Sequence, residues 1–293
     1  MKATVALIYA MATAPMAMAW GMQVHSVIGK VADELLSPGG LRLFRWLLPS
    51  TTLADASAWA DYAKMTPQYS YTRDFHYIKT RDAPPNQCSF YDGRDCPNGN
   101  CLVGAIAEYT SVFQNFQKKS RRELGDALKF LMHFIGDLTQ PLHVSGHENG
   151  GHSVQVRYGR ATVSLHSVID DNIPWGRIKA NFGGNPDRYA NYLVGRIKQD
   201  RQQNLEARWL SRHSVFDVNE WGNSMAAMEW AVESNALSCA IIWPAYYADP
   251  TQDFSAGFYR EMLWLVDEQL AKAGFRIAFW INKVADEMER GRR

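Results

Sequence analysis

The sequence lacks two features that would place a chain of 293 residues in a membrane or polyanion-binding class. After the first nineteen residues no apolar run reaches the length of about 18 residues that a spanning helix needs, so we expect no membrane anchor. The chain also has no excess of positive charge, since 31 basic and 30 acidic residues give a net charge of +1. Proteins that hold nucleic acid mainly through lysine and arginine are usually far more basic. Any polyanion site must therefore be local, and bound metal cations could supply its charge.

Cysteine is scarce, and no Asn-x-Ser/Thr site for N-glycosylation is present. No Cys-x2-Cys pair exists, which argues against a zinc-thiolate site. Four cysteines in an oxidising compartment favour two disulfides. Cys96 and Cys101 can close a local loop, and Cys88 would then reach across the chain to Cys239. The sequence alone allows three pairings.

The first nineteen residues have the organisation of a secretory signal peptide. Lys2 supplies a positive start, an apolar stretch follows from Ala3, and Ala17–Ala19 is a small-x-small cleavage site. The alternative is a buried N-terminal helix. We expect a secreted protein that is cleaved after Ala19.

Apolar periodicity predicts an all-α protein, and 46% hydrophobic residues are enough for a real core. No repeat or linker is visible, so one domain over residues 20–293 is expected. A small β-hairpin is predicted near 152–166, where apolar and polar residues alternate around Gly-Arg. Residues 82–100 are expected to form a loop. The predicted helices cover residues 24–36, 51–64, about 102–116, about 122–138, 187–200, 202–211, 221–247 and about 256–289, the last broken near Gly274.

The histidines and aspartates carry the chemical signal. His133 and Asp137 are four residues apart in a predicted helix, so both side chains leave one face. His166 and Asp170 repeat this spacing. Imidazole and carboxylate are the ligand set of Zn²⁺ and similar cations. On spacing alone, a multinuclear metal site and a set of hydrogen-bonded structural pairs both stay open. The other candidate ligands are His25, Asp61, His76 and His143.

Four segments resemble the S1/P1 nuclease family, the fungal and plant three-zinc single-strand nucleases related to bacterial zinc phospholipase C. They are WGMQVH at 20–25, WADYAK at 59–64, HFIGDLTQPLH at 133–143 and GGHSVQV…SLHSVID at 150–170. The resemblance runs nearly end to end, and it implies a phospholipase C/P1 nuclease-like fold.

The resemblance also implies nine ligand residues for three zinc ions and the disulfides Cys88–Cys239 and Cys96–Cys101. The α-amino nitrogen and carbonyl oxygen of Trp20 would both be ligands, and only cleavage after Ala19 frees that amine. The first zinc would be held by Asp61, His76, His133 and Asp137, the second by His143, His166 and Asp170, and the third by Trp20, His25 and Asp137.

The function implied is that of a secreted, zinc-dependent endonuclease acting on single-stranded DNA and RNA. A hydroxide bridging two zincs would be the nucleophile, the products would carry 5′-phosphates, and 3′-nucleotides would also be substrates. Asp61 and Asp137 would serve catalysis, and Tyr77 takes the base-stacking position. Lys64 stands where the family commonly has arginine, and it keeps the charge without the bidentate fork. No stable protein partner is implied.

Departures from the family pattern leave alternatives open. Gly150-Gly151-His152 replaces a usual Gly-Gly-Asn, and Ser164 precedes Leu165-His166 where asparagine is usual. A zinc-dependent phospholipase C-like phosphodiesterase and a non-catalytic secreted zinc-binding protein are the two rival interpretations. The histidines outside the ligand set are expected to be solvated or in loops; they are His147, His152 and His213.

Overall fold

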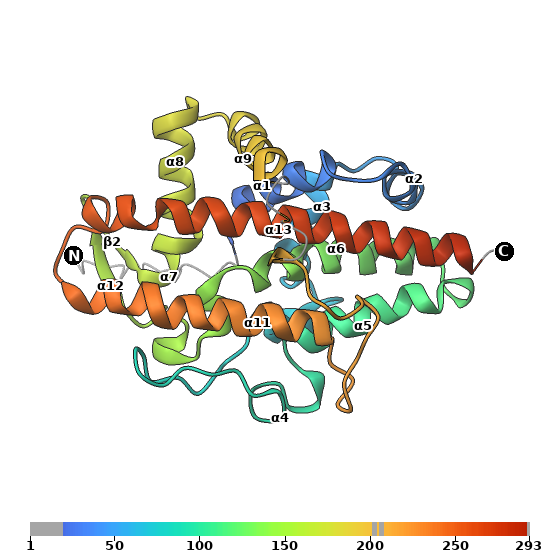
Figure 1. Cartoon of the computed structure of the whole chain (residues 1–293), viewed down its shortest axis with the longest axis horizontal. Coiled ribbons are helices and arrows are strands. Elements are labelled where there is room, and N and C mark those ends of the chain that lie inside the picture. The colour runs from blue at the N-terminus through green and yellow to red at the C-terminus, as the bar shows by residue number, and fades with distance from the viewer. Residues whose placement is uncertain (1–19, 201–203, 205–207, 292–293) are drawn as a thin grey trace, which may run out of the picture.

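The computed structural model describes residues 20–200, 204 and 208–291. These residues form a helical protein with one two-stranded antiparallel hairpin, which confirms the expected all-α class (Figure 1). The α-helices are α1 (Met22–Asp33), α2 (Pro38–Leu47), α3 (Leu53–Ala63), α4 (Asp92–Asp95), α5 (Leu102–Gln114), α6 (Arg121–Leu138), α7 (Leu165–Ser167), α8 (Ile173–Phe182), α9 (Pro186–Asp200), α11 (Met225–Leu237), α12 (Trp243–Ala248) and α13 (Gly257–Arg290). Short 3-10 helices include η1 (Ser70–His76) and η4 (Pro141–Val144), and two π-helical turns are η6 (Val168–Asn172) and η8 (Ser238–Ile242).

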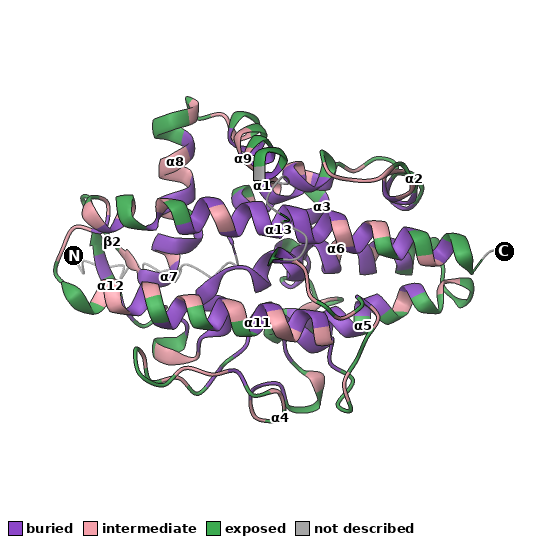
Figure 2. Cartoon of the chain, viewed as in Figure 1, coloured by how far each residue is buried: buried purple, intermediate pink, exposed green. Residues whose placement is uncertain are grey.

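The long helix α13 crosses the molecule and packs on α6 (Figure 1). Helices α1 and α3 contact each other and α6 from one side, and α5 and α11 contact α6 as well. Buried residues gather along α6 and in the middle of α13 (Figure 2). Because α6 lies inside this arrangement, side chains on its inward face meet residues from several other elements.

Local sequence explains how α6 begins and ends. Ser120 accepts a hydrogen bond from the Glu123 amide, and the Glu123 carboxylate accepts one from the Ser120 amide, which forms a capping box. The helix ends at Leu138, three residues before Pro141. The last two turns therefore place His133 and Asp137 near a defined end of the helix.

Two helices lie where the sequence predicts breaks. Residues 38–40, interpreted as a stop, are the first turn of α2, because Ser37 caps the helix and Pro38 fits its first position. Helix α8 falls in the expected polar break before residue 187. Its apolar pattern is weak, with Ile173, Pro174 and Ile178 as its buried residues, and its packing on α13 supports the helix.

The expected break of α13 at Gly274 is wrong, because the helix runs unbroken to Arg290. A Cβ at Gly274 would lie 2.4 Å from Cγ1 of Val31 on α1. The glycine permits close approach of two helices rather than a kink.

The expected start of a helix at Trp221 is also wrong, since α11 begins after Ser224, whose hydroxyl accepts a hydrogen bond from the Ala227 amide. Half of the helix predicted for residues 202–211 falls outside the described residues; of the rest, residues 208 and 209 are helical.

The predicted hairpin is confirmed. Strands β1 (Gln155–Tyr158) and β2 (Ala161–Ser164) pair around Gly159-Arg160. Residues 82–100 are mostly loop, as expected, with the short helix α4 and a 3-10 turn. Both disulfides form as the resemblance implies, between Cys88 and Cys239 and between Cys96 and Cys101.

Helices able to cross a membrane are absent from the described residues. The signal peptide predicted for residues 1–19 lies outside them.

Candidate metal centre

Two helix C-termini bring carboxylates into the same buried space. Asp61 lies in the last turn of α3 and Asp137 in the last turn of α6, and both side chains are buried. The negative end of the helix dipole disfavours a carboxylate at this position. Burial disfavours it further unless a partner compensates the charge. Two buried carboxylates on contacting helices therefore need positive charge close to them.

Two imidazoles complete a compact set of four ligand-type atoms. His133 Nε2 lies 3.0 Å from His76 Nδ1, 3.2 Å from Asp137 Oδ2 and 3.6 Å from Asp61 Oδ1. His76 Nδ1 lies 3.0 Å from Asp137 Oδ2 and 4.0 Å from Asp61 Oδ1. Ligands at zinc distances in a tetrahedron are separated by about 3.4 Å. These spacings therefore suit one tetrahedral ion.

Backbone carbonyls orient three of the imidazoles. His133 Nδ1 lies 2.7 Å from the Ser57 carbonyl, and His143 Nδ1 lies 2.9 Å from the His76 carbonyl. His166 Nδ1 lies 2.7 Å from the Gly150 carbonyl. A carbonyl can only accept, so Nδ1 is the protonated nitrogen of each neutral ring, and Nε2, which faces a carboxylate, is left as the nitrogen that can bind a metal. This is the usual arrangement behind a metal-bound histidine.

A second group lies beyond Asp137. His166 Nε2 is 2.8 Å from Asp170 Oδ2, and His143 Nε2 is 3.6 Å from Asp170 Oδ1. The ligand atoms of these three buried residues lie within 4.8 Å of one another. Gln140, also buried, donates to Asp170 Oδ1 at 2.6 Å and accepts from the Leu142 amide. Gln140 thus fixes the orientation of the Asp170 carboxylate.

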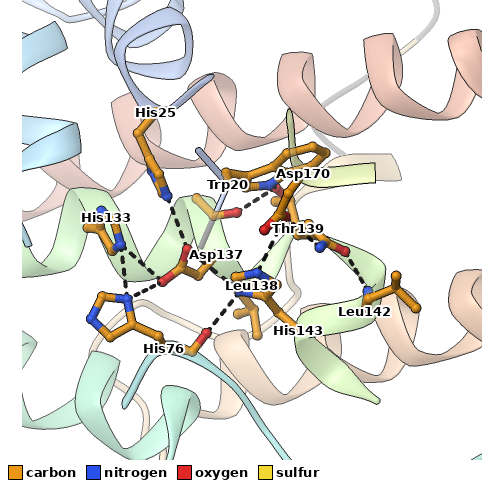
Figure 3. A network of polar contacts seen from close by, with 12 residues as sticks. Trp20, His25, His76, His133, Asp137, Leu138, Thr139, Leu142, His143 and Asp170 are labelled. Atoms are coloured by element: carbon orange, nitrogen blue, oxygen red, sulfur yellow. Dashed lines mark hydrogen bonds and ion pairs between the residues drawn. The ribbon is translucent and has the colours of Figure 1, made fainter. Parts of the chain in front are cut away.

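Asp137 faces two directions at once (Figure 3). Its Oδ2 atom points to His76 and His133, and its Oδ1 atom lies 3.1 Å from His25 Nε2. Trp20 is fully buried nearby, with its indole N–H 3.4 Å from the Thr139 hydroxyl. The carboxylate can therefore serve two neighbouring ions, one on each oxygen.

The protonation states suit a cation site. Burial lowers the pKa of His76 to about 4 despite the nearby Asp137, so the imidazole is neutral at pH 7. Burial opposes ionisation of Asp137, but His133, His25 and His76 together hold the pKa of its carboxyl well below the usual range. Burial opposes the charged form of His133 and His143, but the neighbouring Asp137, Asp61 and Asp170 raise the pKa of these imidazoles. Neutral imidazole beside ionised carboxylate is the form that binds metal, so metal binding at His133 and His143 would release any proton that they hold.

Several buried atoms in this cluster lack a hydrogen-bond partner among the described residues. They are His25 Nδ1, Asp61 Oδ2, His76 Nε2 and His143 Nε2. Unpaired buried polar atoms are rare and costly, and an ion is one of the explanations for them. The donor set of nitrogen and carboxylate oxygen fits zinc or a related cation.

Lys64 and Tyr77 border the cluster. Lys64 is buried, and its Nζ atom donates to Asp61 Oδ1 at 2.6 Å. Tyr77 is half-buried and follows His76, and its hydroxyl donates to Asp74 at 2.6 Å. Burial and the Asp74 carboxylate raise the pKa of Tyr77. The Lys79 ammonium lies 5.0 Å from the centroid of the Tyr77 ring, which adds a cation beside this surface.

The remaining histidines differ from one another. His213 is partly exposed and lies 3.6 Å from Glu229, and His147 is partly exposed with Tyr247 as its hydrogen-bond partner at 2.7 Å. His152 is not a simple loop histidine, because its ring stacks on His166 at a centroid distance of 3.7 Å. Burial and the neighbouring His166 lower the pKa of His152 to about 4.

Two residues that lie beside the cluster, Gln140 and Asp171, were not predicted from the sequence. Gln140 reaches Asp170 across thirty residues of sequence, and only the helix-ending Gln140-Pro141 marked its position. Asp171 directly follows a candidate ligand, yet it was not considered. Although the residue is exposed, its carboxylate lies against Gly21, and desolvation there together with Asp170 and Asp61 raises the pKa of Asp171 to about 7.

Comparison with known proteins identifies the family. The model of the S1/P1 nuclease family matches residues 20–286. The chain belongs to the S1/P1 nuclease family. It is 30% identical over 269 residues to nuclease PA3 of a Penicillium species, covering 90% of this chain and 97% of that protein. Nuclease S1 of Aspergillus oryzae is 28% identical, covering 94% and 96%, and endonuclease 2 of Arabidopsis thaliana is 29% identical, covering 96% and 94%.

Membership of this nuclease family makes the chain a hydrolase of phosphodiester bonds in nucleic acid. The described residues contain three His/Asp groups able to hold a metal ion, and together the groups draw on all the ligand side chains expected from the sequence. A solved structure of Clostridium perfringens alpha-toxin matches with a TM-score of 0.45 and 11% identity, covering 94% of this chain and 65% of that one. That likeness is too low to bear on function.

Proposed function

We propose that the protein is a secreted zinc-dependent endonuclease that hydrolyses single-stranded DNA and RNA to products with 5′-phosphates, and that it also removes the phosphate of 3′-nucleotides. The observation that carries this proposal is the convergence of His76, His133, Asp61 and Asp137 at spacings suited to one tetrahedral ion. The proposal extends the family's phosphodiester chemistry to a particular metal and substrate form.

The zinc ligands we propose fall into three sets, of which the first and the third share Asp137. The first set is Asp61, His76, His133 and Asp137; the second is His143, His166 and Asp170; the third is His25, Asp137 and the backbone of Trp20. The three histidines with carbonyl-bound Nδ1 atoms belong to the first and second sets. When bound, the zinc ions would supply Lewis-acid stabilisation of the phosphoryl oxygens and a water acidic enough to react near neutral pH.

The chain's own residues then have separate tasks. Asp137 holds two sets together, and Gln140 keeps Asp170 in one orientation. Lys64 brings a buried positive charge to the edge of the first set, where it steadies Asp61 and can offset charge that develops on the phosphate. This charge is delivered by a single ammonium group and not by a planar fork.

Access favours an unstacked strand as substrate. The candidate ligand side chains are at most 5% exposed, so a phosphate must enter a recess to reach them. A strand whose bases are unstacked can bend into such a recess and lay a base on an aromatic ring. Tyr77 is the proposed ring, because it follows His76 directly and is half-exposed at the border of the cluster.

Processing is part of the proposal. Cleavage after Ala19 would free the α-amino group of Trp20, and the indole of that residue is already fully buried beside Thr139. Export would thus complete the third set of ligands.

The test compares single-stranded and duplex DNA of the same sequence with the processed protein, before and after chelation and with zinc added back. We expect chelator-sensitive, zinc-restored cleavage of the single strand. His133→Ala should lower the rate at least about 100-fold together with zinc content. His213→Ala, outside the cluster, is the matched control and should keep both the hydrolysis rate and the zinc content.

Cleavage of phosphatidylcholine in place of DNA would overturn the proposal in favour of a phospholipase. Zinc binding without hydrolysis of either substrate would indicate a storage protein.

A further inference from the structure

The backbone conformation at residue 21 does not require glycine. Its φ of -48° and ψ of 150° are open to any residue. A Cβ at this position, however, would lie 1.5 Å from Oδ1 and 2.6 Å from Cγ of Asp171. The missing side chain at residue 21 therefore makes room for the Asp171 carboxylate, which lies directly against the start of α1.

The π-helical turn η6 supplies this carboxylate. Residues Val168–Asn172 form a wider turn than an α-helix, and such turns are frequent at functional sites. Asp170 in this turn points into the second candidate metal set, where it meets His143 and His166. Its neighbour Asp171 faces Gly21 instead. One short segment thus joins the metal cluster to the first residues of the described chain.

Asp171 has no hydrogen bond or ion pair within the described part of the chain. The charged groups that act on it there are two carboxylates, those of Asp170 and Asp61. Asp171 is exposed, so water can solvate it, and a donor or a cation beside Gly21 would offset the repulsion from the other two carboxylates. Trp20 directly precedes Gly21, and successive Cα atoms are about 3.8 Å apart. The backbone nitrogen of Trp20 is therefore close to the place where the Asp171 carboxylate contacts Gly21.

We propose that Asp171 is a positioning residue that accepts a hydrogen bond from the free α-amino group of Trp20 in the processed chain. This inference rests on the proposed function, in which that amine is a zinc ligand. An amine bound to a metal through its lone pair still carries N–H donors, and a carboxylate that accepts from them orients the ligand and raises its basicity. Asp171 would act on the third set of ligands as Gln140 acts on the second.

The contact would distinguish processed from unprocessed chains. In a chain with one more residue, the Trp20 nitrogen is part of a peptide bond, whose resonance removes the lone pair from metal binding. Asp171 then has no ligand to orient. Its contribution to metal binding should therefore exist only after cleavage.

The test is a four-way comparison of zinc retention, measured as zinc per chain across a series of chelator concentrations. The four proteins are the processed chain, the chain with one glycine added before Trp20, and each of these with Asp171→Asn. In the processed chain we expect Asp171→Asn to weaken retention of one zinc about 10- to 100-fold. In the extended chain, which should already lack that zinc, the substitution should change nothing. Asp286→Asn, an exposed aspartate on α13, controls for the lost charge.

Gly21→Ala provides a second, independent test of the contact, because its methyl group would displace the Asp171 carboxylate. It should weaken the same zinc as Asp171→Asn, and the combined variant should be no worse than Gly21→Ala alone. If Asp171→Asn keeps full zinc retention while the added glycine removes one zinc, the role of Asp171 is wrong and the proposed third site stands. If the added glycine leaves zinc retention unchanged, the third site and the role of Asp171 are both overturned.

Discussion

Asp137 lies where burial and the C-terminal dipole of α6 both act against an ionised carboxylate. Three imidazoles within hydrogen-bonding range reduce this penalty, with His25 on one oxygen and His76 and His133 on the other side. Among the described residues three imidazole nitrogens of the cluster have no hydrogen-bond partner, namely His25 Nδ1, His76 Nε2 and His143 Nε2. A metal ion bound by the nitrogens that face Asp137 would supply the positive charge that the buried carboxylate lacks.

Gln140→Leu tests the support of Asp170. Leucine keeps the volume but removes the 2.6 Å hydrogen bond to Asp170 and the acceptor for the Leu142 amide. We expect zinc affinity at the second set to fall about 10- to 100-fold, as for other residues behind a metal ligand. Equilibrium dialysis with zinc measures this. Gln269→Leu is the matched control, because Gln269 is equally buried and bonds only the Thr139 carbonyl; equal losses in the two variants would contradict the role of Gln140.

At this scale, the sequence predicted which histidines and aspartates would lie together better than it predicted the residues that support them. His133 and Asp137 share a helix face at a fixed spacing, so local periodicity was sufficient. Gln140 and Asp171 act through contacts to residues far away in sequence, and no spacing rule reports such contacts. His152 was expected to be solvated or in a loop; it does lie in the turn before β1, but its ring also stacks on His166.

Among the elements, short irregular segments present several of the ligands. His76 ends the 3-10 helix η1, His143 lies in the 3-10 helix η4, and Asp170 lies in the π-helical turn η6. The regular helices α3 and α6 supply the buried frame, and α1 brings His25 in its first turn. A rigid helical frame with short turns around it can place imidazoles more closely than parallel helix faces could alone.

Gly274→Ala tests the contact between α1 and α13. The added methyl group would meet Val31 Cγ1 at 2.4 Å, so the helices must separate, and α1 carries His25. We expect a loss of about 1 to 3 kcal/mol in the free energy of unfolding, measured by urea denaturation. Val31→Ala in the same chain should recover part of it.

The control for this substitution is Gly195→Ala on α9, where nothing lies within 4 Å of the new atom. Alanine is the better helix former at an exposed position, so this variant should gain about 0.5 to 1 kcal/mol. A gain at Gly274 as well would show that the close approach of α1 is unimportant.

The element pattern was predictable where apolar periodicity was strong and capping signals agreed. Helices α5 and α6 and the hairpin appear close to the expected bounds. Helix α2 was lost because Pro38 and two glycines look like a stop, although Ser37 makes them a start. Gly274 was interpreted as a helix break, but a glycine in a helix can also permit close packing. Only the position of the neighbouring helix distinguishes the two.

For the whole molecule, the two disulfides close loops of very different length. Cys88 and Cys239 are 151 residues apart, whereas Cys96 and Cys101 are 5 apart. The longer one joins the loop that follows His76 to the π-helical turn after α11, so it spans most of the candidate metal centre in sequence. Closing a longer loop removes more entropy from the unfolded chain.

Replacing the two disulfides separately by serine pairs should therefore have unequal effects. In the chain-entropy model, loss of Cys88–Cys239 lowers the free energy of unfolding by about 5 kcal/mol and loss of Cys96–Cys101 by about 2 kcal/mol. Urea denaturation of the metal-free proteins measures both without interference from zinc binding. Equal losses, or a larger loss for the short loop, would contradict this ranking.

The charge of the whole chain also fits a local site for phosphate. With a net charge of +1, long-range attraction to a polyanion is weak, so binding must depend on the metal centre and a few side chains such as Lys64. The sequence showed this balance directly. What it could not show is that Lys64 is itself engaged by Asp61, because that pairing depends on the geometry of the helix end.

The most direct test of the central claim is a zinc titration of chelator-stripped, processed protein, with bound zinc and hydrolysis of single-stranded DNA measured in the same samples. We expect no hydrolysis without metal and full activity only as occupancy approaches three zinc ions per chain. Full activity in the stripped protein, or saturation with zinc at three ions without any hydrolysis, would contradict it.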